Sequence, residues 1–244
     1  GSTSDVIAAE TVEIYAHKEV TLFAGSRVTG GTIQVTSDVN IQISGTITAS
    51  GVNVDYSSKG SGITGKPWEE GTKHWYGGSG GSHGGKGSHS ACDVSTVDTY
   101  GSATSPWDYG GRGGRSGEDK MAGGAGGGRI RIAAGANLTI GGEISANGAA
   151  GNSGSSQYKG AGGGGAGGSI QLEAISITGT GSVSANGGSG GSGYDSYTYS
   201  RWQSGGGGGG GRISTNFITM TDALTLSVHG RCRNNRKQDV ITSA

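Results

Sequence analysis

Aromatic side chains lie mainly in the glycine-rich parts of the chain, where they would present flat faces to sugars or partner proteins. The strip 194–202 mixes Tyr, Ser, Asp, Arg and Trp, a composition typical of adaptable recognition loops. A second interpretation stays open, in which the rings shield the backbone hydrogen bonds of the glycine segments from water. The predicted binding residues are Tyr194, Tyr197, Tyr199 and Trp202, and secondarily Trp68, His74, Trp75 and Trp107.

Acidic and histidine side chains gather between residues 68 and 108, which raises the question of a metal or acid–base site. Their spacing does not support one. His83 and His89 lie six residues apart in glycine-rich chain, and no CxxC, HExxH or calcium-loop pattern occurs. We therefore predict no metal and no cofactor, and we assign His83 to backbone hydrogen bonding within the HGGKG turn.

Carboxylates are sparse in the strand-like repeats of the chain. A polysaccharide lyase or hydrolase needs clustered carboxylates on one outer face of stacked strands. The carboxylates available are Glu13, Glu19, Asp38, Glu143, Glu173 and Asp222, and none recurs at matching repeat positions. No nucleophile elbow or phosphate loop is present. The sequence favours a non-catalytic chain, with a polysaccharide-active β-helix enzyme (lyase or hydrolase) as the alternative.

The composition of the chain excludes some classes of binding partner. The chain has 244 residues, 56 of them glycine, and its 18 Lys and Arg balance its 18 Asp and Glu. A zero net charge argues against nucleic-acid binding, and the lack of a long apolar run predicts no membrane insertion by this fragment. Glycine-rich chains are often disordered. Here, however, the glycines concentrate in 52–128, 149–168 and 188–211, between stretches that alternate like β-strands.

These strand-like stretches repeat. Residues 32–51 align without a gap on residues 129–148, at a shift of 97, and further copies occupy 169–187, 212–230 and, more loosely, 11–30. Ile33 and Val35 fall on Ile130 and Ile132. Because strands this short cannot form a free-standing sheet, stacking of successive copies is expected. We predict an all-β fold, a short right-handed parallel β-solenoid of about five rungs.

The three glycine-rich insertions are predicted to leave the solenoid and to return along glycine runs that lead straight into the next strand. We expect these runs to pack as extended polyglycine-II-like helices, hydrogen-bonded backbone to backbone, because only dense pairing offsets the entropy of ordering glycine. Flexible surface loops are the alternative. The predicted organisation is an N-terminal cap with a cloning remnant (1–10), one solenoid domain (11–230) and a tail or linker (231–244).

Several glycine motifs follow one another along the chain: GGSGGSHGGKG (77–87), YGSATSPWDYGGRGG (100–114), GGAGGGRIRI (123–132), GGEISANG (141–148), GGGGAGGSIQLEA (162–174), GTGSVSANGG (179–188), GGGGGGGRIS (205–214) and VHG (228–230). In this combination and order they resemble the glycine-rich ectodomain module of large membrane-anchored surface proteins of plants and other eukaryotes. The resemblance implies an extracellular or cell-surface module of a larger chain. It supplies no catalytic residues, and a glycan or an extracellular protein is the expected partner.

In that surface setting, a disulfide between Cys92 and Cys232 is favoured, although two unrelated thiols remain the alternative. The module usually carries a cysteine pair where this sequence has Cys92 alone. Asn137-Leu138-Thr139 matches the acceptor sequence for N-glycosylation, so Asn137 is a candidate glycan attachment site. The expected function is an adhesion scaffold that displays aromatic-tipped, glycine-rich loops.

Overall fold

The computed structural model describes residues 6–52, 59–65, 77–89, 97–117, 121–154, 160–193, 204–221 and 224–231. Strands account for all the regular secondary structure in these ranges. They are β1 (Val6–Ala16), β2 (Glu19–Leu22), β3 (Arg27–Ser37), β4 (Asn40–Ile43), β5 (Thr46–Thr48), β6 (Arg129–Ala134), β7 (Asn137–Ile140), β8 (Glu143–Ser145), β9 (Ser169–Glu173), β10 (Ser176–Thr178), β11 (Ser182–Ser184), β12 (Arg212–Asn216), β13 (Thr219–Met220) and β14 (Thr225–Ser227). No helix in the described ranges has the length and hydropathy to cross a membrane.

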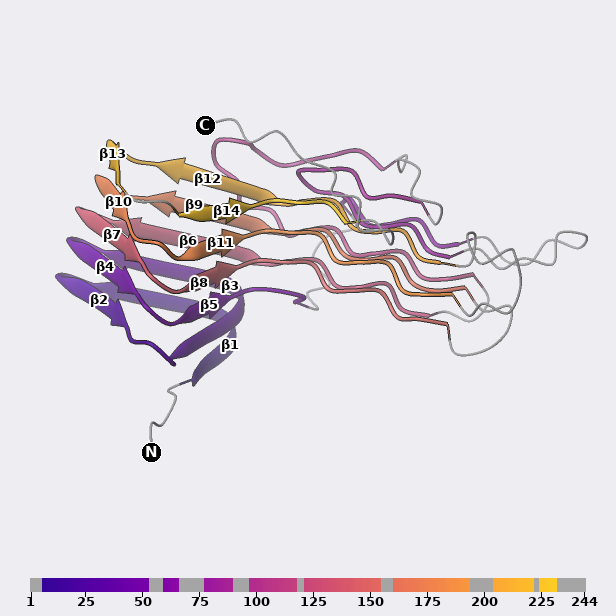
Figure 1. Ribbon diagram of the computed structural model, residues 1–244, viewed down its shortest axis with the longest axis horizontal. Coiled ribbons are helices and arrows are strands. Elements are labelled where there is room, and N and C mark those ends of the chain that lie inside the picture. The colour runs from indigo at the N-terminus through magenta and orange to yellow at the C-terminus, as the bar shows by residue number, and fades with distance from the viewer. Residues whose placement is uncertain are drawn as a thin grey trace, which may run out of the picture.

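The strands form two parallel sheets. The larger has nine strands, eight of them in the order β12-β9-β6-β3-β5-β8-β11-β14, with β1 paired to β3. The smaller has five, in the order β13-β10-β7-β4-β2. Figure 1 shows both sheets at one end of the molecule, with the extended glycine-rich segments running away from them.

The all-β class is observed, but the predicted solenoid of about five rungs is wrong. The main sheet curves through its eight-strand path into a nearly closed, barrel-like surface, and a second parallel sheet lies beside it. The reason lies in β3, a single strand of 11 residues. Its residues 27–29 pair with β5 and its residues 32–37 pair with β6. The predicted boundary between the repeats 11–30 and 32–51 falls inside this strand, which passes through it without a corner and joins both sets of pairings into one sheet.

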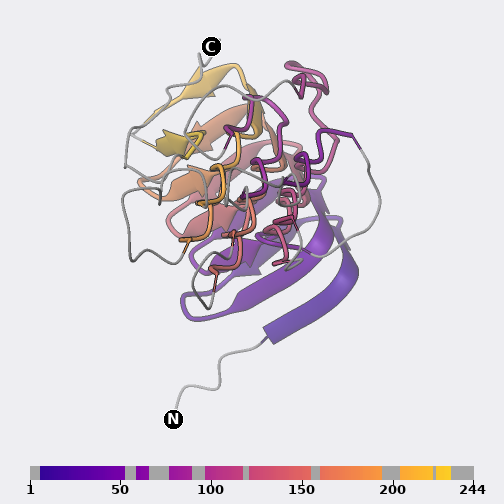
Figure 2. The same cartoon turned by 90° about the vertical axis from the view of Figure 1, so that its right-hand side faces the viewer.

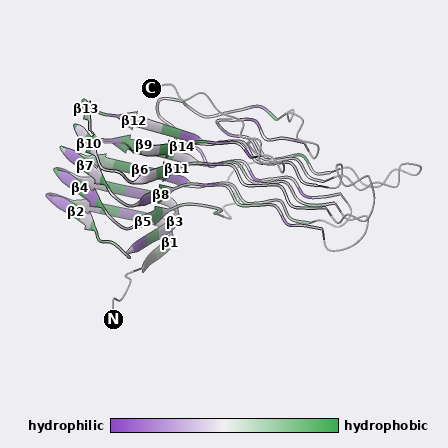
Figure 3. Ribbon diagram, viewed as in Figure 1, coloured by the Kyte–Doolittle hydropathy of each residue, from purple (hydrophilic) through white to green (hydrophobic). Residues whose placement is uncertain are grey.

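The core follows the repeat alignment residue by residue. Ile33 pairs with Ile130, which pairs with Ile170, and all three are fully buried. In the second sheet Ile41 pairs with Leu138, which pairs with Ile177. Figure 3 shows the hydrophobic residues concentrated on the strands. Each short strand therefore depends on its neighbours to bury its apolar face, as stacked repeats do.

The glycine segments hydrogen-bond to one another with a period of three. In the segment 162–168 each backbone N–H donates to a carbonyl oxygen of another segment. The first neighbour, 146–152, accepts from residues 162, 165 and 168. The second, 111–114, accepts from residues 163 and 166, and the third, 206–209, accepts from residues 164 and 167. Each segment thus turns to the same neighbour every third residue, which is the periodicity of a polyproline-II helix. Figure 2, seen from the far end of these segments, shows them gathered beside one another as tight coils.

The close approach of neighbouring backbones explains why these segments are rich in glycine. A Cβ atom added at Gly164 would lie 2.1 Å from the carbonyl oxygen of Gly188. One added at Gly113 would lie 2.0 Å from the carbonyl oxygen of Gly163. Side chains are therefore excluded at such positions, and the interior of this glycine bundle (the described parts of 77–89, 110–128, 146–154, 160–168, 187–193 and 204–211) consists mainly of backbone.

Candidate functional site

An arginine that stacks on two aromatic rings marks the candidate binding site. The guanidinium carbon of Arg129, the first residue of β6, lies 4.7 Å from the ring centre of Trp107 and 4.8 Å from that of Tyr109. Its Nε donates to Thr32 Oγ1 (3.0 Å), and its Nη1 donates to the carbonyl oxygen of Trp107 (3.3 Å). The Tyr109 hydroxyl lies 2.6 Å from Thr32 Oγ1. Stacking and hydrogen bonds together fix the cation in one orientation.

These residues line a pocket of about 410 Å³, within the size range of small-molecule sites. The lining residues are Glu10, Thr11, Thr32, Lys59, Trp107, Asp108, Tyr109 and Arg129. Two cations, two carboxylates, hydroxyls and aromatic rings thus face one space. Such a lining can hydrogen-bond to a polyhydroxylated ligand while an aromatic ring packs against its C–H groups.

The glycine bundle positions the aromatic residues of this pocket. The Tyr100 hydroxyl donates to the Tyr109 carbonyl oxygen, and the next residue, Gly110, donates its N–H to Gly127 at 2.8 Å. The Ser169 hydroxyl donates to the carbonyl oxygen of Asp108 at 2.6 Å, which ties the segment to β9. Because Gly127 lies two residues before Arg129, the same backbone contacts set the arginine and the rings relative to each other.

His83 is fully buried, with its ring centre 4.9 Å from that of Tyr100. Its Nδ1 is 2.8 Å from the carbonyl oxygen of Gly167, so Nδ1 carries the proton that bonds to that oxygen. The ring therefore bonds to the backbone of the second glycine-rich insertion, whereas the His83 N–H donates to the Gly85 carbonyl oxygen at 3.0 Å, within the HGGKG turn as predicted. Burial lowers the pKa of His83 to about 4, so the ring is neutral near pH 7. Its Nε2 is buried and has no hydrogen-bond partner among the described residues.

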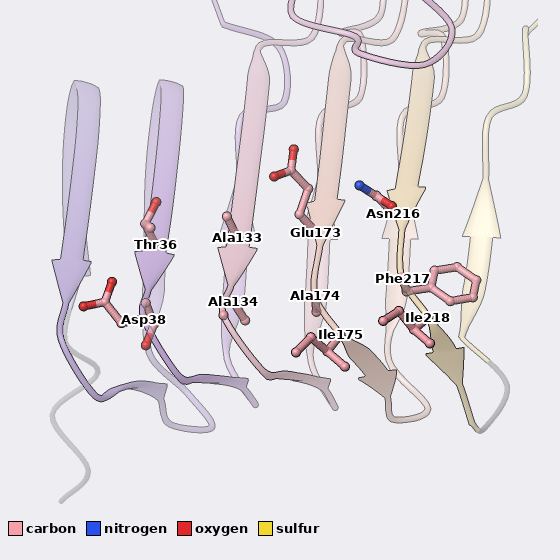
Figure 4. A pocket seen from close by; sticks show the side chains of 12 residues that line it. Thr36, Asp38, Ala133, Ala134, Glu173, Ala174, Ile175, Asn216, Phe217 and Ile218 are labelled. Carbon is pink, nitrogen blue, oxygen red and sulfur yellow. The ribbon is translucent and has the colours of Figure 1, made fainter.

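A second concavity crosses the corners that follow β3, β6, β9 and β12, and we call it the corner groove. Its volume is about 520 Å³. It is lined by Thr36, Ser37, Asp38, Ala133, Ala134, Gly135, Glu173, Ala174, Ile175, Asn216, Phe217 and Ile218. Figure 4 shows Asp38 at one end and Phe217 at the other, with Glu173 between them. Glu173 is paired with Arg131 at 3.1 Å, so its carboxylate already has a partner.

Of the predicted binding residues, Trp107 lies in the described ranges, and it lines the pocket. The others lie outside those ranges: Tyr194, Tyr197, Tyr199, Trp202, Trp68, His74 and Trp75, together with Cys92 and Cys232. Asn137 is exposed at the start of β7, and its amide donates to Asn40 Oδ1 at 3.0 Å. Its glycosylation stays a prediction.

Sequence reasoning missed Arg129, Tyr109 and Thr32 as site residues. A signal for part of the site was present, because the repeat alignment at a shift of 97 places Arg129 opposite Thr32. Nothing in the sequence places Tyr109 beside that pair. Its position follows from how the glycine segments pack.

Neither a metal-binding cluster among the described residues nor a similar known protein was found that would define the site further. Within the described ranges, no group of three or more His, Cys, Asp or Glu side chains is arranged to hold a metal ion. The site is therefore defined by the arginine, the two rings and their hydroxyl partner. No family model matches the chain, and comparison with curated proteins and with solved structures finds no similar one.

Proposed function

We propose that this chain is a non-catalytic extracellular module that binds a glycan in the pocket around Arg129. The observation that carries the proposal is the guanidinium stacked on Trp107 and Tyr109, at 4.7 and 4.8 Å from their ring centres. A cation held in this way loses little further freedom when it hydrogen-bonds to ligand oxygens. The resemblance of the glycine motifs to surface-protein ectodomains supports the extracellular setting.

Mixed polar and aromatic lining favours a glycan over a flat protein surface. A pocket of about 410 Å³ accommodates a small ligand or the end of a chain. Protein interfaces are larger and bury a central apolar patch. A protein partner would instead have to present a side chain or a sugar to this pocket, and it is an outcome that the binding test distinguishes.

A glycan array tests the proposal directly. The wild-type chain is expected to bind a defined subset of neutral or acidic oligosaccharides, and Arg129→Gln and Trp107→Leu are expected to weaken that binding at least about tenfold. Arg131→Gln is the matched control, because Arg131 lies on the same strand but pairs with Glu173, which lines the corner groove. Absence of glycan binding by the wild type, or equal binding by Arg129→Gln and Arg131→Gln, would overturn the proposal.

The enzyme alternative has a separate readout. Asp38 and Glu173 both line the corner groove, but hydrogen bonds from Tyr15 and from Gln171 engage their carboxylates. We therefore expect no new reducing or unsaturated ends when the bound oligosaccharides are incubated with the chain. Release of either product, lost in Asp38→Asn, would replace the binding module with a polysaccharide-active enzyme.

A further inference from the structure

Three side chains of different chemistry meet on the surface beside the corner groove. The Tyr15 hydroxyl lies 2.9 and 3.0 Å from the two carboxylate oxygens of Asp38, and 3.0 Å from Nδ1 of His17. His17 Nδ1 lies 3.0 Å from Asp38 Oδ2. The three donor atoms therefore form a nearly equilateral triangle. Together they combine an imidazole, a carboxylate and a phenol, which are all ligands for transition metals.

We propose that Tyr15, His17 and Asp38 form a binding site for one divalent transition-metal ion of the Cu²⁺ or Zn²⁺ type. Two ligands about 2.1 Å from the same ion and at right angles to each other lie about 3.0 Å apart. The three separations in this cluster all have that value. Three ligand positions at right angles around a tetragonal Cu²⁺ ion therefore match the triangle, whereas a tetrahedral Zn²⁺ ion would require the three donor atoms to spread to about 3.4 Å.

The backbone holds the three residues in place. Tyr15 is the second-to-last residue of β1, and His17 is the first residue of the bend that follows the strand. Ala16 pairs with Ser37 across β1 and β3, and the Asp38 N–H donates to the Ala16 carbonyl oxygen at 3.1 Å. The pairing of β1 with β3 thus brings the two corners together, and His17 and Asp38 are the first residues of the bends that directly follow these strands.

The carboxylate of the cluster and its exposure to solvent both favour the binding of a cation. Asp38 brings a carboxylate to the cluster, and the Tyr15 hydroxyl and His17 Nδ1 both lie within hydrogen-bond distance of it. The side chains of His17 and Asp38 are 83% and 50% exposed, so an ion reaches them from solvent. His17 and Asp38 would supply the stronger bonds, and Tyr15 the weaker.

Calorimetric titration of the full chain with CuCl₂ and with ZnCl₂ tests the site. The wild type is expected to bind one ion, and His17→Gln and Asp38→Asn are expected to weaken binding at least about tenfold, with a smaller loss for Tyr15→Phe. Glu13→Gln removes a neighbouring exposed carboxylate, and His89→Gln removes a histidine elsewhere; both controls are expected to bind like the wild type.

A second measurement locates the ion. Cu²⁺ is expected to broaden the amide resonances of residues 15–17 and 38 at substoichiometric amounts, before any others. Failure of the wild type to bind either ion, binding by His17→Gln and Asp38→Asn equal to that of the two controls, or broadening that begins elsewhere would each overturn the proposal. Because these side chains are exposed, thermal unfolding of the variants is expected to match the wild type.

Discussion

A single methyl group placed in the glycine bundle should destabilise the whole fold. In Gly164→Ala the new Cβ would lie 2.1 Å from the Gly188 carbonyl oxygen, whereas ordinary contact begins near 3.4 Å. The segment that contains Gly188 must therefore move by about 1.3 Å, the difference between these distances. That movement breaks the bonds from the Gly188 N–H to Gly165 and from the Gly208 N–H to Gly188, both 2.8 Å long.

The cost can be estimated from these parts. Each buried hydrogen bond contributes about 1 kcal/mol, and forcing a methyl group into a packed interior costs about 1–3 kcal/mol. We expect Gly164→Ala to lower the free energy of unfolding by about 3–5 kcal/mol, a large share of the stability of an ordinary domain.

The prediction is tested by measuring the free energy of unfolding in urea for Gly164→Ala and for the control Gly141→Ala. A Cβ at Gly141 would meet only the Ile43 carbonyl oxygen, at 3.9 Å, so this control should be neutral or more stable by about 0.4–1 kcal/mol. Free energies of unfolding for the two variants that agree to within about 0.5 kcal/mol would refute the close packing of the glycine bundle.

Three further outcomes are expected. Leu138→Ala, at a fully buried position, should cost about 2–5 kcal/mol in a urea unfolding assay, whereas Ile218→Ala, at a position 79% exposed, should cost less than about 0.5 kcal/mol; similar losses would contradict the assigned core. The folded-state pKa of His83, about 4, lies below its unfolded value of 6.5, so the native state binds fewer protons and about 3 kcal/mol of stability should be lost as pH falls from 6.5 to 4. His83→Gln should flatten this slope, and an unchanged slope would assign it to other groups. Amides 162–168 should exchange slowly with deuterium, because each donates to a backbone carbonyl of another segment; exchange at the rate of an unfolded peptide would contradict the pairing.

The strand register could be predicted from the sequence because it is written in the repeats. The alignment of 32–51 with 129–148 is the observed pairing of β3 with β6 and of β4 with β7. Apolar side chains at a period of two can be buried only if like positions stack. The closure of the main sheet could not be predicted in this way. Gly30 and Gly31 have the composition of a corner, yet they continue β3, which pairs with β1 on both sides of them. Glycine is needed at position 30 because a Cβ there would lie 2.8 Å from the Ala9 carbonyl oxygen on β1.

The pocket was harder to predict than the core. Trp107 was recognised as a candidate because exposed aromatic rings bind ligands, but its partners Arg129 and Tyr109 were not. Thr32 and Tyr109 are 77 residues apart, and the glycine segments between them determine where the ring arrives. Because glycine has no side chain, the sequence of these segments does not indicate which of them pack against one another. The proximity of Tyr15 to Asp38, in contrast, could be predicted from the sequence. The shift of 21 between the first two repeats places Tyr15 opposite Thr36, two residues before Asp38.

The threefold periodicity of the glycine bundle also limits how its length can evolve. Each segment presents its N–H groups to three different neighbours in rotation, so deleting one residue turns every later donor by a third of a revolution, toward the wrong acceptor. Deletion or duplication of three residues restores the phase. Related chains should therefore differ within these segments by whole turns.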